Sequence, residues 1–162
     1  MSGFHRKLSM LLLALCAAGA ARATVEVRFV QPEKFADVGE GAIEREQNLK
    51  QLQGYIADLA GKQVPAAQRL VVDVLDVDLA GEIESRGRRM ERLRVLKDVS
   101  WPSMKLRYVL SEGDKTLREG EARLSHMGYL MGSAIRAGSE PLGYERRMLE
   151  DWFRKEFASA KP

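Results

Sequence analysis

The segment Arg69–Leu79, RLVVDVLDVDL, limits the possible folds of this sequence more than any other part. Its first half is apolar at consecutive positions, which is typical of a strand that is covered on both faces. Asp76 and Asp78 mark the point where the segment becomes more polar. We therefore expect a strand over residues 69–79, placed at the centre of a sheet.

Two amphipathic helices are predicted, one between the first strand and the central strand and one at the C-terminal end of the chain. In residues 42–62, the apolar residues Leu49, Leu52, Ile56 and Leu59 recur at helical spacing, Tyr55 broadens the stripe, and Gly61 is placed to end the helix. Residues 144–157 carry a second broad stripe, made of Tyr144, Met148, Leu149, Trp152, Phe153 and Phe157. This stripe must be buried against the sheet or against a partner.

The remaining alternating segments predict strands. Val25–Gln31 alternates and is closed by Pro32, as in an edge or first strand, and residues 92–124 read as three consecutive strands. The first of these has Leu93, Val95, Val99 and Trp101 in one phase. In the last of these strands, the apolar residue Leu117 has an odd number and Ala122 an even one. The alternation must therefore shift by one residue between them, and we place a β-bulge at Gly120. The predicted fold is α+β: a mainly antiparallel sheet of about four to five strands with two principal amphipathic helices packed on it.

Residues 1–23 have the pattern of a secretory signal peptide: basic Arg6 and Lys7, an apolar run, and small residues around Arg22. The apolar run is about half as long as a membrane-spanning helix, so no transmembrane anchor is expected after cleavage near Ala23. Lipidation at Cys16 is the alternative, although Leu15 before it fits that pattern poorly. We expect residues 24–162 to form a single α+β domain, exported to the periplasm or secreted.

Cleavage at this point would change the charge and the available chemistry. It removes three of the 26 basic residues and none of the 23 acidic ones, which leaves no formal net charge and no argument for a nucleic-acid partner. The only cysteine leaves with the leader, and His126 becomes the only histidine. Cysteine chemistry and a centre built from several histidines are thereby excluded, and no cofactor is expected.

The stretch LDVDLAGE contains the acidic residues Asp76, Asp78 and Glu82. In a regular strand Asp76 and Asp78 share a face, ~6.5 Å apart, and Asp73 points to the other. A calcium-binding loop starting at Asp76 fails at its fifth and twelfth positions. A small metal-dependent hydrolase that uses this acidic cluster is one hypothesis. The favoured interpretation is a strand end that turns through Gly81, with the aspartates capping nearby amides.

Two further groups of residues could bind ligands. The run RGRRMERLRVLK holds Arg86, Arg88, Arg89, Arg92 and Arg94, which could meet lipid phosphates, lipopolysaccharide or an acidic protein, or form a solvated loop before an exposed strand. His126, Met127 and Met131 are a ligand set suited to Cu(I), but the methionines would face together only in a helix. Ser133 lacks the G-x-S-x-G pattern of a catalytic serine.

Five segments, VEVRFVQPEKFADVG, LDVDLAGE, WPSMKLRYVL, GEARL and YERRMLEDWFRKEF, follow one another in the chain. In this order they resemble the secreted bacterial family known as domain of unknown function 3016. The resemblance implies an exported protein and domain boundaries close to those of the whole chain after the leader, and it implies no activity. With few catalytic residue types present, we expect a non-enzymatic binding or accessory module of the bacterial envelope, with the hydrolase as the alternative.

Overall fold

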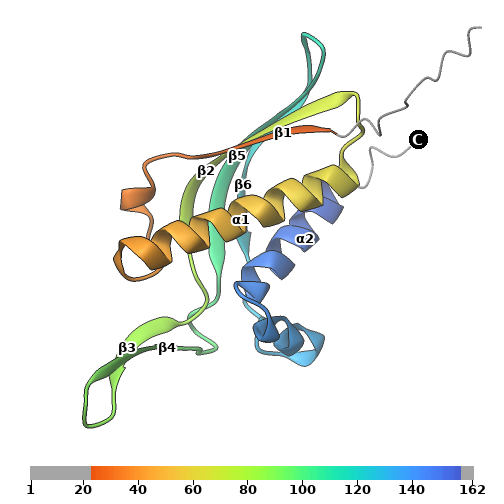
Figure 1. The fold of residues 1–162 in the computed structure, drawn as a ribbon. Helices are drawn as coiled ribbons and strands as arrows, with labels where there is room; N and C mark the ends of the chain where they lie inside the picture. The colour runs from red at the N-terminus through yellow and green to blue at the C-terminus, as the bar shows by residue number, and fades with distance from the viewer. Residues whose placement is uncertain (1–22, 158–162) are drawn as a thin grey trace, which may run out of the picture.

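The computed structural model describes residues 23–157, so of the predicted leader only Ala23 is included, and Cys16 lies outside the described residues. Figure 1 shows a main sheet with strand order β1-β2-β5-β6 and a separate hairpin, β3-β4. The strands are β1 (Thr24–Phe29), β2 (Gln68–Asp78), β3 (Glu82–Arg86), β4 (Glu91–Val95), β5 (Ser103–Glu112) and β6 (Lys115–Ser125). The helices are α1 (Gly41–Gln63), α2 (Gly143–Phe157) and two short 3₁₀ helices, η1 (Pro32–Lys34) and η2 (Gly132–Ser139).

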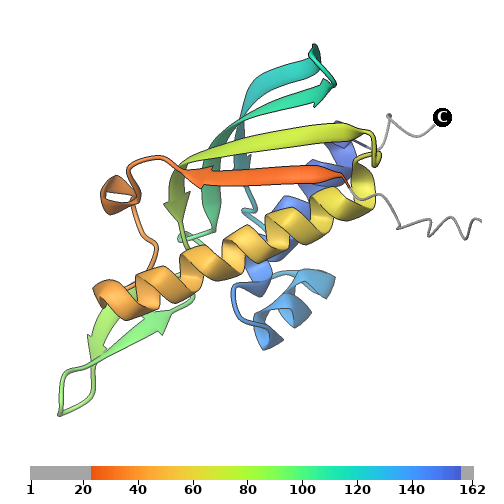
Figure 2. The ribbon, with the colours of Figure 1, turned by 45° about the horizontal axis from the view of Figure 1, so that its top comes forward.

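The main sheet and the two α-helices form two layers, with α1 and α2 on the same face of the sheet (Figure 2). The predicted helices and their apolar stripes are confirmed, because both stripes are buried in a common core with the sheet, except for Tyr144, which packs in a separate small cluster. Members of this core include Leu52, Ile56, Leu70, Val72, Val74, Leu106, Leu149 and Phe153, none of which is exposed.

The opposite face of the sheet is polar. The expectation that β2 is covered on both faces is therefore wrong: Val71 is only half-buried, and its neighbour on the same face is charged. There Asp73 accepts a hydrogen bond from Arg28 Nε at 2.6 Å and another from Arg107 at 3.3 Å. A row of ion pairs across three strands thus takes the place of a second covering layer.

The α+β fold class is confirmed, and so are the central position of β2 and the edge position of β1. The main sheet is mixed, since β1 runs parallel to β2, whereas β5 is antiparallel to both β2 and β6. The parallel pair follows from the order of elements, because α1 returns the chain to the end at which β1 began.

Two β-bulges change which residues share a face. In β2, Val74 pairs with Leu106 and Asp76 with Lys105, so Leu75 is the extra residue. The bulge places Asp73 on the same side as Asp76 and Asp78, which corrects the expected alternation. In β6 the extra residue is Leu117. The slip expected at Gly120 therefore occurs three positions earlier, and Gly120 pairs regularly with Tyr108.

The hairpin β3-β4 differs most from the sequence-based expectation. The strand β3 was not predicted, and β4 pairs with β3 instead of joining the main sheet. The predicted strand through Trp101 stops at Val95, and Leu93 and Val99 are 50% and 69% exposed. The hairpin therefore adds little to the core and extends from one end of the molecule (Figures 1 and 2).

Candidate functional site

The base of the hairpin is held by hydrogen bonds to its backbone groups. The Gly81 N–H donates to the Ser100 carbonyl at 2.9 Å, and this bond joins the residue just before β3 to the segment that follows β4. The Tyr129 hydroxyl donates to the Lys97 carbonyl at 2.6 Å, and it accepts from the Lys97 N–H at 3.0 Å. Because Tyr129 is fully buried, these two bonds hold the residues just after β4 in a defined place.

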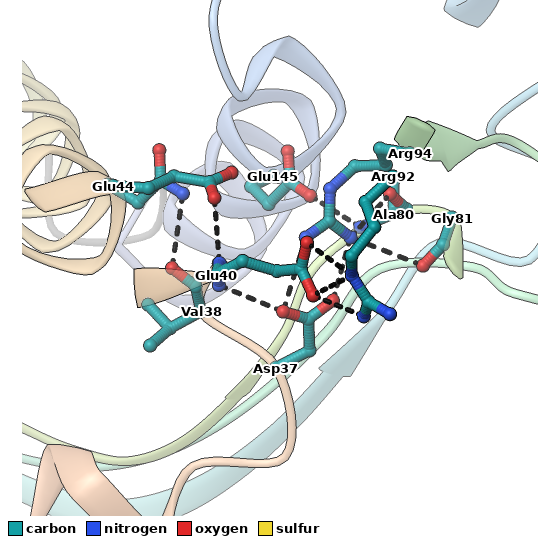
Figure 3. Close-up of polar contacts among 11 residues, drawn as sticks. Asp37, Val38, Glu40, Glu44, Ala80, Gly81, Arg92, Arg94 and Glu145 are labelled. Atoms are coloured by element: carbon teal, nitrogen blue, oxygen red, sulfur yellow. Dashed lines mark hydrogen bonds and ion pairs between the residues drawn. The ribbon is translucent and has the colours of Figure 1, made fainter. Parts of the chain in front are cut away.

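Two arginines of β4 fix the direction of the hairpin, as Figure 3 shows. Arg94 Nη1 lies 2.7 Å from Asp37 Oδ2, and it also donates to the carbonyls of Ala80 and Gly81 at 3.4 and 3.3 Å. Arg92 Nε donates to both carboxylate oxygens of Glu40, at 2.7 and 2.9 Å. Arg94 and Asp37 are mostly buried, whereas Arg92 and Glu40 are more exposed, so the Arg94 pair is the stronger anchor.

The five arginines named from the sequence therefore do not form one patch. Alternation along β4 turns Arg92 and Arg94 toward the segment before α1. Arg86 in β3 pairs with Glu84 at 2.6 Å. Arg88 and Arg89 occupy the turn at the far end of the hairpin, and both are exposed. Two of the five thus point away from the body, and the other three hold the hairpin together or to the body.

A buried carboxyl group, which sequence reasoning missed, lies behind the Arg94 anchor. Glu145 in the first turn of α2 is 2% exposed, and its Oε1 accepts a hydrogen bond from the Ala80 N–H at 2.8 Å. Burial raises the pKa of Glu145, although the Ala80 amide opposes the shift. A sequence signal existed, because Glu145 precedes Leu149 by four positions and Trp152 by seven, which places it on the buried stripe of α2.

The three acidic residues of LDVDLAGE have different roles. Asp76 Oδ1 accepts hydrogen bonds from the N–H groups of Ala36 and Val77, both at 2.9 Å, so this side chain caps amides as the favoured interpretation stated. Glu82 is exposed and accepts from Lys97 Nζ at 3.1 Å. Asp78 is half-buried, and burial, followed by the nearby charges of Asp37 and Asp76, raises the pKa of its carboxyl.

A small cleft of about 330 Å³ brings together part of this acidic group. Asp78 and Glu82 line it with Ser100 and Ser103, but Asp76 does not. Burial raises the pKa of the Asp78 carboxyl, which is the direction that suits a carboxyl group to acid–base chemistry. Within residues 23–157, no three His, Cys, Asp or Glu side chains are grouped so that they could hold a metal ion.

The His126 segment does not meet the condition set for a copper site. Residues 126–129 form turns after β6 instead of a helix, and Met127 and Met131 are 64% and 72% exposed. The helical spacing that would bring the two thioethers together is therefore missing. The side chain of Ser133 lies outside the described part of the structure.

We expect Asp78→Ala to leave the response to divalent metals unchanged. Millimolar Ca²⁺, Mg²⁺ or Zn²⁺ should shift the melting temperature by less than about 1 °C in the variant and in the wild type, because a weakly bound ion adds little to the free energy of unfolding. Thermal unfolding with and without each metal measures this, and Asp58→Ala on the exposed side of α1 is the control. A metal-induced rise that only Asp78→Ala abolishes would contradict the expectation.

No helix within residues 23–157 is long and apolar enough to cross a membrane. Comparison with known proteins gives one family match: the model described as protein of unknown function (DUF3016) matches residues 23–155, which confirms the resemblance noted from the sequence. No curated protein matches the chain.

Two solved structures share low similarity with the chain. A hypothetical protein of Chlamydia trachomatis is 13% identical, with a TM-score of 0.37 over 86% of this chain and 96% of its own. A proposed lipoprotein of Caulobacter crescentus is 19% identical, with a TM-score of 0.35 over 85% and 93%. At these scores neither structure carries information about function.

Proposed function

Because the chain belongs to the DUF3016 family of proteins of unknown function, we propose a role from its own surface: an exported, non-enzymatic module of the bacterial envelope that binds anionic lipid through its β3-β4 hairpin. The observation that carries this proposal is the composition of the hairpin tip. Arg88 and Arg89 are exposed in the turn, beside Met90, which is 66% exposed.

The tip combines two features that suit a membrane surface. Its guanidinium groups can bind lipid phosphates with paired hydrogen bonds, and the apolar side chains of Met90 and Leu93, both at least half exposed, can enter the boundary between headgroups and acyl chains. Among the described residues no ion pair involves Arg88 or Arg89, so neither has to give up a partner on binding. The body of the protein, held to the hairpin by Arg94, would remain outside the lipid.

Export is supported by the pattern of residues 1–23. An exported chain would carry the hairpin into the bacterial envelope, where it could meet the surface of an anionic membrane. The intact mass of the protein purified after expression of the full sequence tests this part of the proposal. A mature chain that begins at Thr24 is the expected result. A purified protein that retains residues 1–23 would contradict export by this route.

The binding role is tested by sedimentation with vesicles. Wild-type protein should sediment with vesicles that contain phosphatidylglycerol or cardiolipin and should remain in solution with neutral phosphatidylcholine vesicles. Arg88→Glu combined with Arg89→Glu should reduce the bound fraction at least about tenfold, since each basic residue near an anionic surface contributes about 1 kcal/mol. The matched control is Lys62→Glu with Lys115→Glu, which changes the net charge equally at exposed positions away from the hairpin.

Met90→Ser separates apolar insertion from charge attraction, and it should weaken binding while leaving the net charge unchanged. Equal losses in the hairpin variant and the control variant would overturn the assignment to the hairpin. Absence of wild-type binding to anionic vesicles would overturn the lipid as partner, and capture of an acidic envelope protein in its place would point to a protein partner.

A further inference from the structure

The strand β1 leaves one edge of the main sheet open. It pairs with β2 on one side, and no other strand among the described residues pairs with it on the other. The strand is regular and contains neither proline nor lysine. Open edges without such protection are templates for pairing with another strand.

The direction of the backbone shows which residues of β1 offer their hydrogen-bonding groups to this edge. The Val30 N–H donates to the Val74 carbonyl at 2.9 Å, so even-numbered residues of the segment face β2. In a parallel pair both backbone groups of a residue point the same way and alternate along the strand. The N–H and C=O groups of Val25, Val27 and Phe29 therefore point to the open edge.

The side chains of β1 are complementary to themselves. When two copies of TVEVRF run antiparallel with Val27 opposite the partner's Val27, Glu26 lies opposite the partner's Arg28, and the same pair occurs a second time by symmetry. The valine pair falls at a hydrogen-bonded position, because the Val27 backbone groups point outward. The two charge pairs then fall at the non-hydrogen-bonded positions, where side chains are closest.

We propose that β1 is a dimer interface and that its occupant is a second copy of this chain, paired antiparallel about Val27. The two main sheets then form one continuous eight-stranded sheet with all four α-helices on one face. The proposal is independent of the hairpin's function, and the interface lies away from the hairpin tip.

The charges select this register over its neighbours. A shift that centres the pairing on Glu26 brings two carboxylates together, and one that centres it on Arg28 brings two guanidinium groups together, both of which are unfavourable. The proposed pairs would replace only a long ion pair between Arg28 and Glu26 of the same chain. Arg28 bonds Asp73 through Nε and Glu26 bonds Arg69 through Oε2, while the Arg28 Nη1 to Glu26 Oε1 distance within one chain is 3.9 Å.

The other edge of the sheet is protected against such pairing. The strand β6 has a bulge at Leu117, and it carries five closely spaced charges, Lys115, Arg118, Glu119, Glu121 and Arg123. Bulges and edge charges are common devices against strand addition. The contrast favours β1 as the edge that is used.

An apolar groove of about 840 Å³ adjoins β1. It lies between the end of β1 and the first half of α1, and its lining includes Phe29, Pro32, Ala42 and Leu49. Pairing of two short strands alone buries less than the ~1,200 Å² of a stable interface. Phe29 belongs to both surfaces, so we expect a second copy on the edge to contact the apolar lining of the groove as well and to add this contact to the area of the strand pair.

Charge reversal with mixing tests the register directly. Light scattering after size exclusion should show wild-type protein, expressed from the full sequence and purified as processed, changing from monomer to dimer over roughly micromolar concentrations. Glu26→Arg and Arg28→Glu should each raise the dimer dissociation constant at least about tenfold, because each places like charges opposite one another. An equimolar mixture of the two variants should regain the dimer, because every cross-strand pair is then between opposite charges.

A disulfide provides a second test that does not depend on charge. In a Cys16→Ser background, Val27→Cys should form a covalent dimer on mild oxidation, because paired Cα atoms at such a position are about 5.5 Å apart and within disulfide range. Thr24→Cys is the control, since it lies opposite the partner's Val30 and its own counterpart is about 20 Å away. The melting temperature of each variant confirms that it is folded.

A wild-type protein that stays monomeric at all concentrations would overturn the proposal, as would a dimer that survives both single reversals. Failure of the mixture to dimerise, with both variants folded, would also overturn it. A monomer that instead binds an extended peptide at β1 would show that another chain occupies the edge.

Discussion

Gly81→Val should lower the melting temperature by about 10 °C. Gly81 has a φ of +84°, where a β-branched residue is strained. A Cβ atom at this position would lie 2.7 Å from the Val95 carbonyl oxygen and 3.0 Å from a methyl group of Leu96. Strain and overlap together cost on the order of 3 kcal/mol, and each kcal/mol moves the melting temperature of a domain of this size by about 3–4 °C.

Gly87→Val is the matched control for this prediction. Gly87 has a similar φ of +73°, but no atom lies within 4 Å of a Cβ built there. Its substitution therefore carries the backbone strain without the overlap and should have a much smaller effect. Calorimetry of both variants measures the difference, and equal melting temperatures for the two would show that the contact between Gly81 and Val95 is unimportant.

Glu145→Leu should lower the free energy of unfolding by about 1–3 kcal/mol at neutral pH, the cost of leaving a buried amide without an acceptor. The amide is that of Ala80, which donates to Glu145 Oε1 at 2.8 Å. Glu145→Gln keeps an acceptor of the same length and removes the titrating group. Both substitutions remove the titrating group, so both effects relative to wild type should vary with pH in the same direction, and Glu145→Leu carries the cost of the unpaired amide in addition.

The direction of this pH dependence follows from the raised pKa of Glu145. Burial lifts the pKa above the ordinary 4.5, so the folded protein binds the proton more tightly than the unfolded chain. The resulting stabilisation is complete below about pH 4.5 and is lost as the pH rises through the folded-state pKa. The pKa of Asp78 is also raised, so it contributes in the same direction.

Denaturant unfolding at pH values from 4 to 8, on the order of one pH unit apart, measures the effect. The free energy of unfolding of Glu145→Gln, relative to wild type, should increase across this range, because only the wild type must bury a charge at the higher pH. Glu119→Gln, at an exposed position on β6, is the control. Parallel profiles for wild type and Glu145→Gln would contradict the argument.

Much of the fold could be predicted from the sequence because most elements bury a single face. The apolar stripes of α1 and α2 and the alternation in β1 and β5 follow directly from that requirement. The bulges at Leu75 and Leu117 could not be placed, since each depends on the partner strand as well as on its own residues. The strand β3, EIESR, has little apolar alternation because it buries neither face in the main core.

The candidate site was predicted less well, because its connections join distant parts of the chain. The arginine run was singled out from the sequence, but nothing local to it shows that Arg94 meets Asp37, 57 positions earlier. Likewise, the spacing of Glu145 places it on a buried stripe, whereas its bond to Ala80 depends on how α2 docks. The capping role of Asp76 could be predicted for the Val77 amide, which is the next along the strand, whereas the Ala36 amide lies 40 positions earlier and depends on the fold.

The small apolar cluster of Ala80, Tyr129 and Tyr144 at the base of the hairpin is separate from the main core. The protein has two tryptophans, and they are divided between these two apolar regions: Trp101 packs on the small cluster, and Trp152 lies in the main core. The molecule therefore carries a natural fluorophore in each of its apolar regions. If the hairpin end opens before the rest, the emission of Trp101 will change at lower denaturant than that of Trp152, and the chain will unfold in two steps.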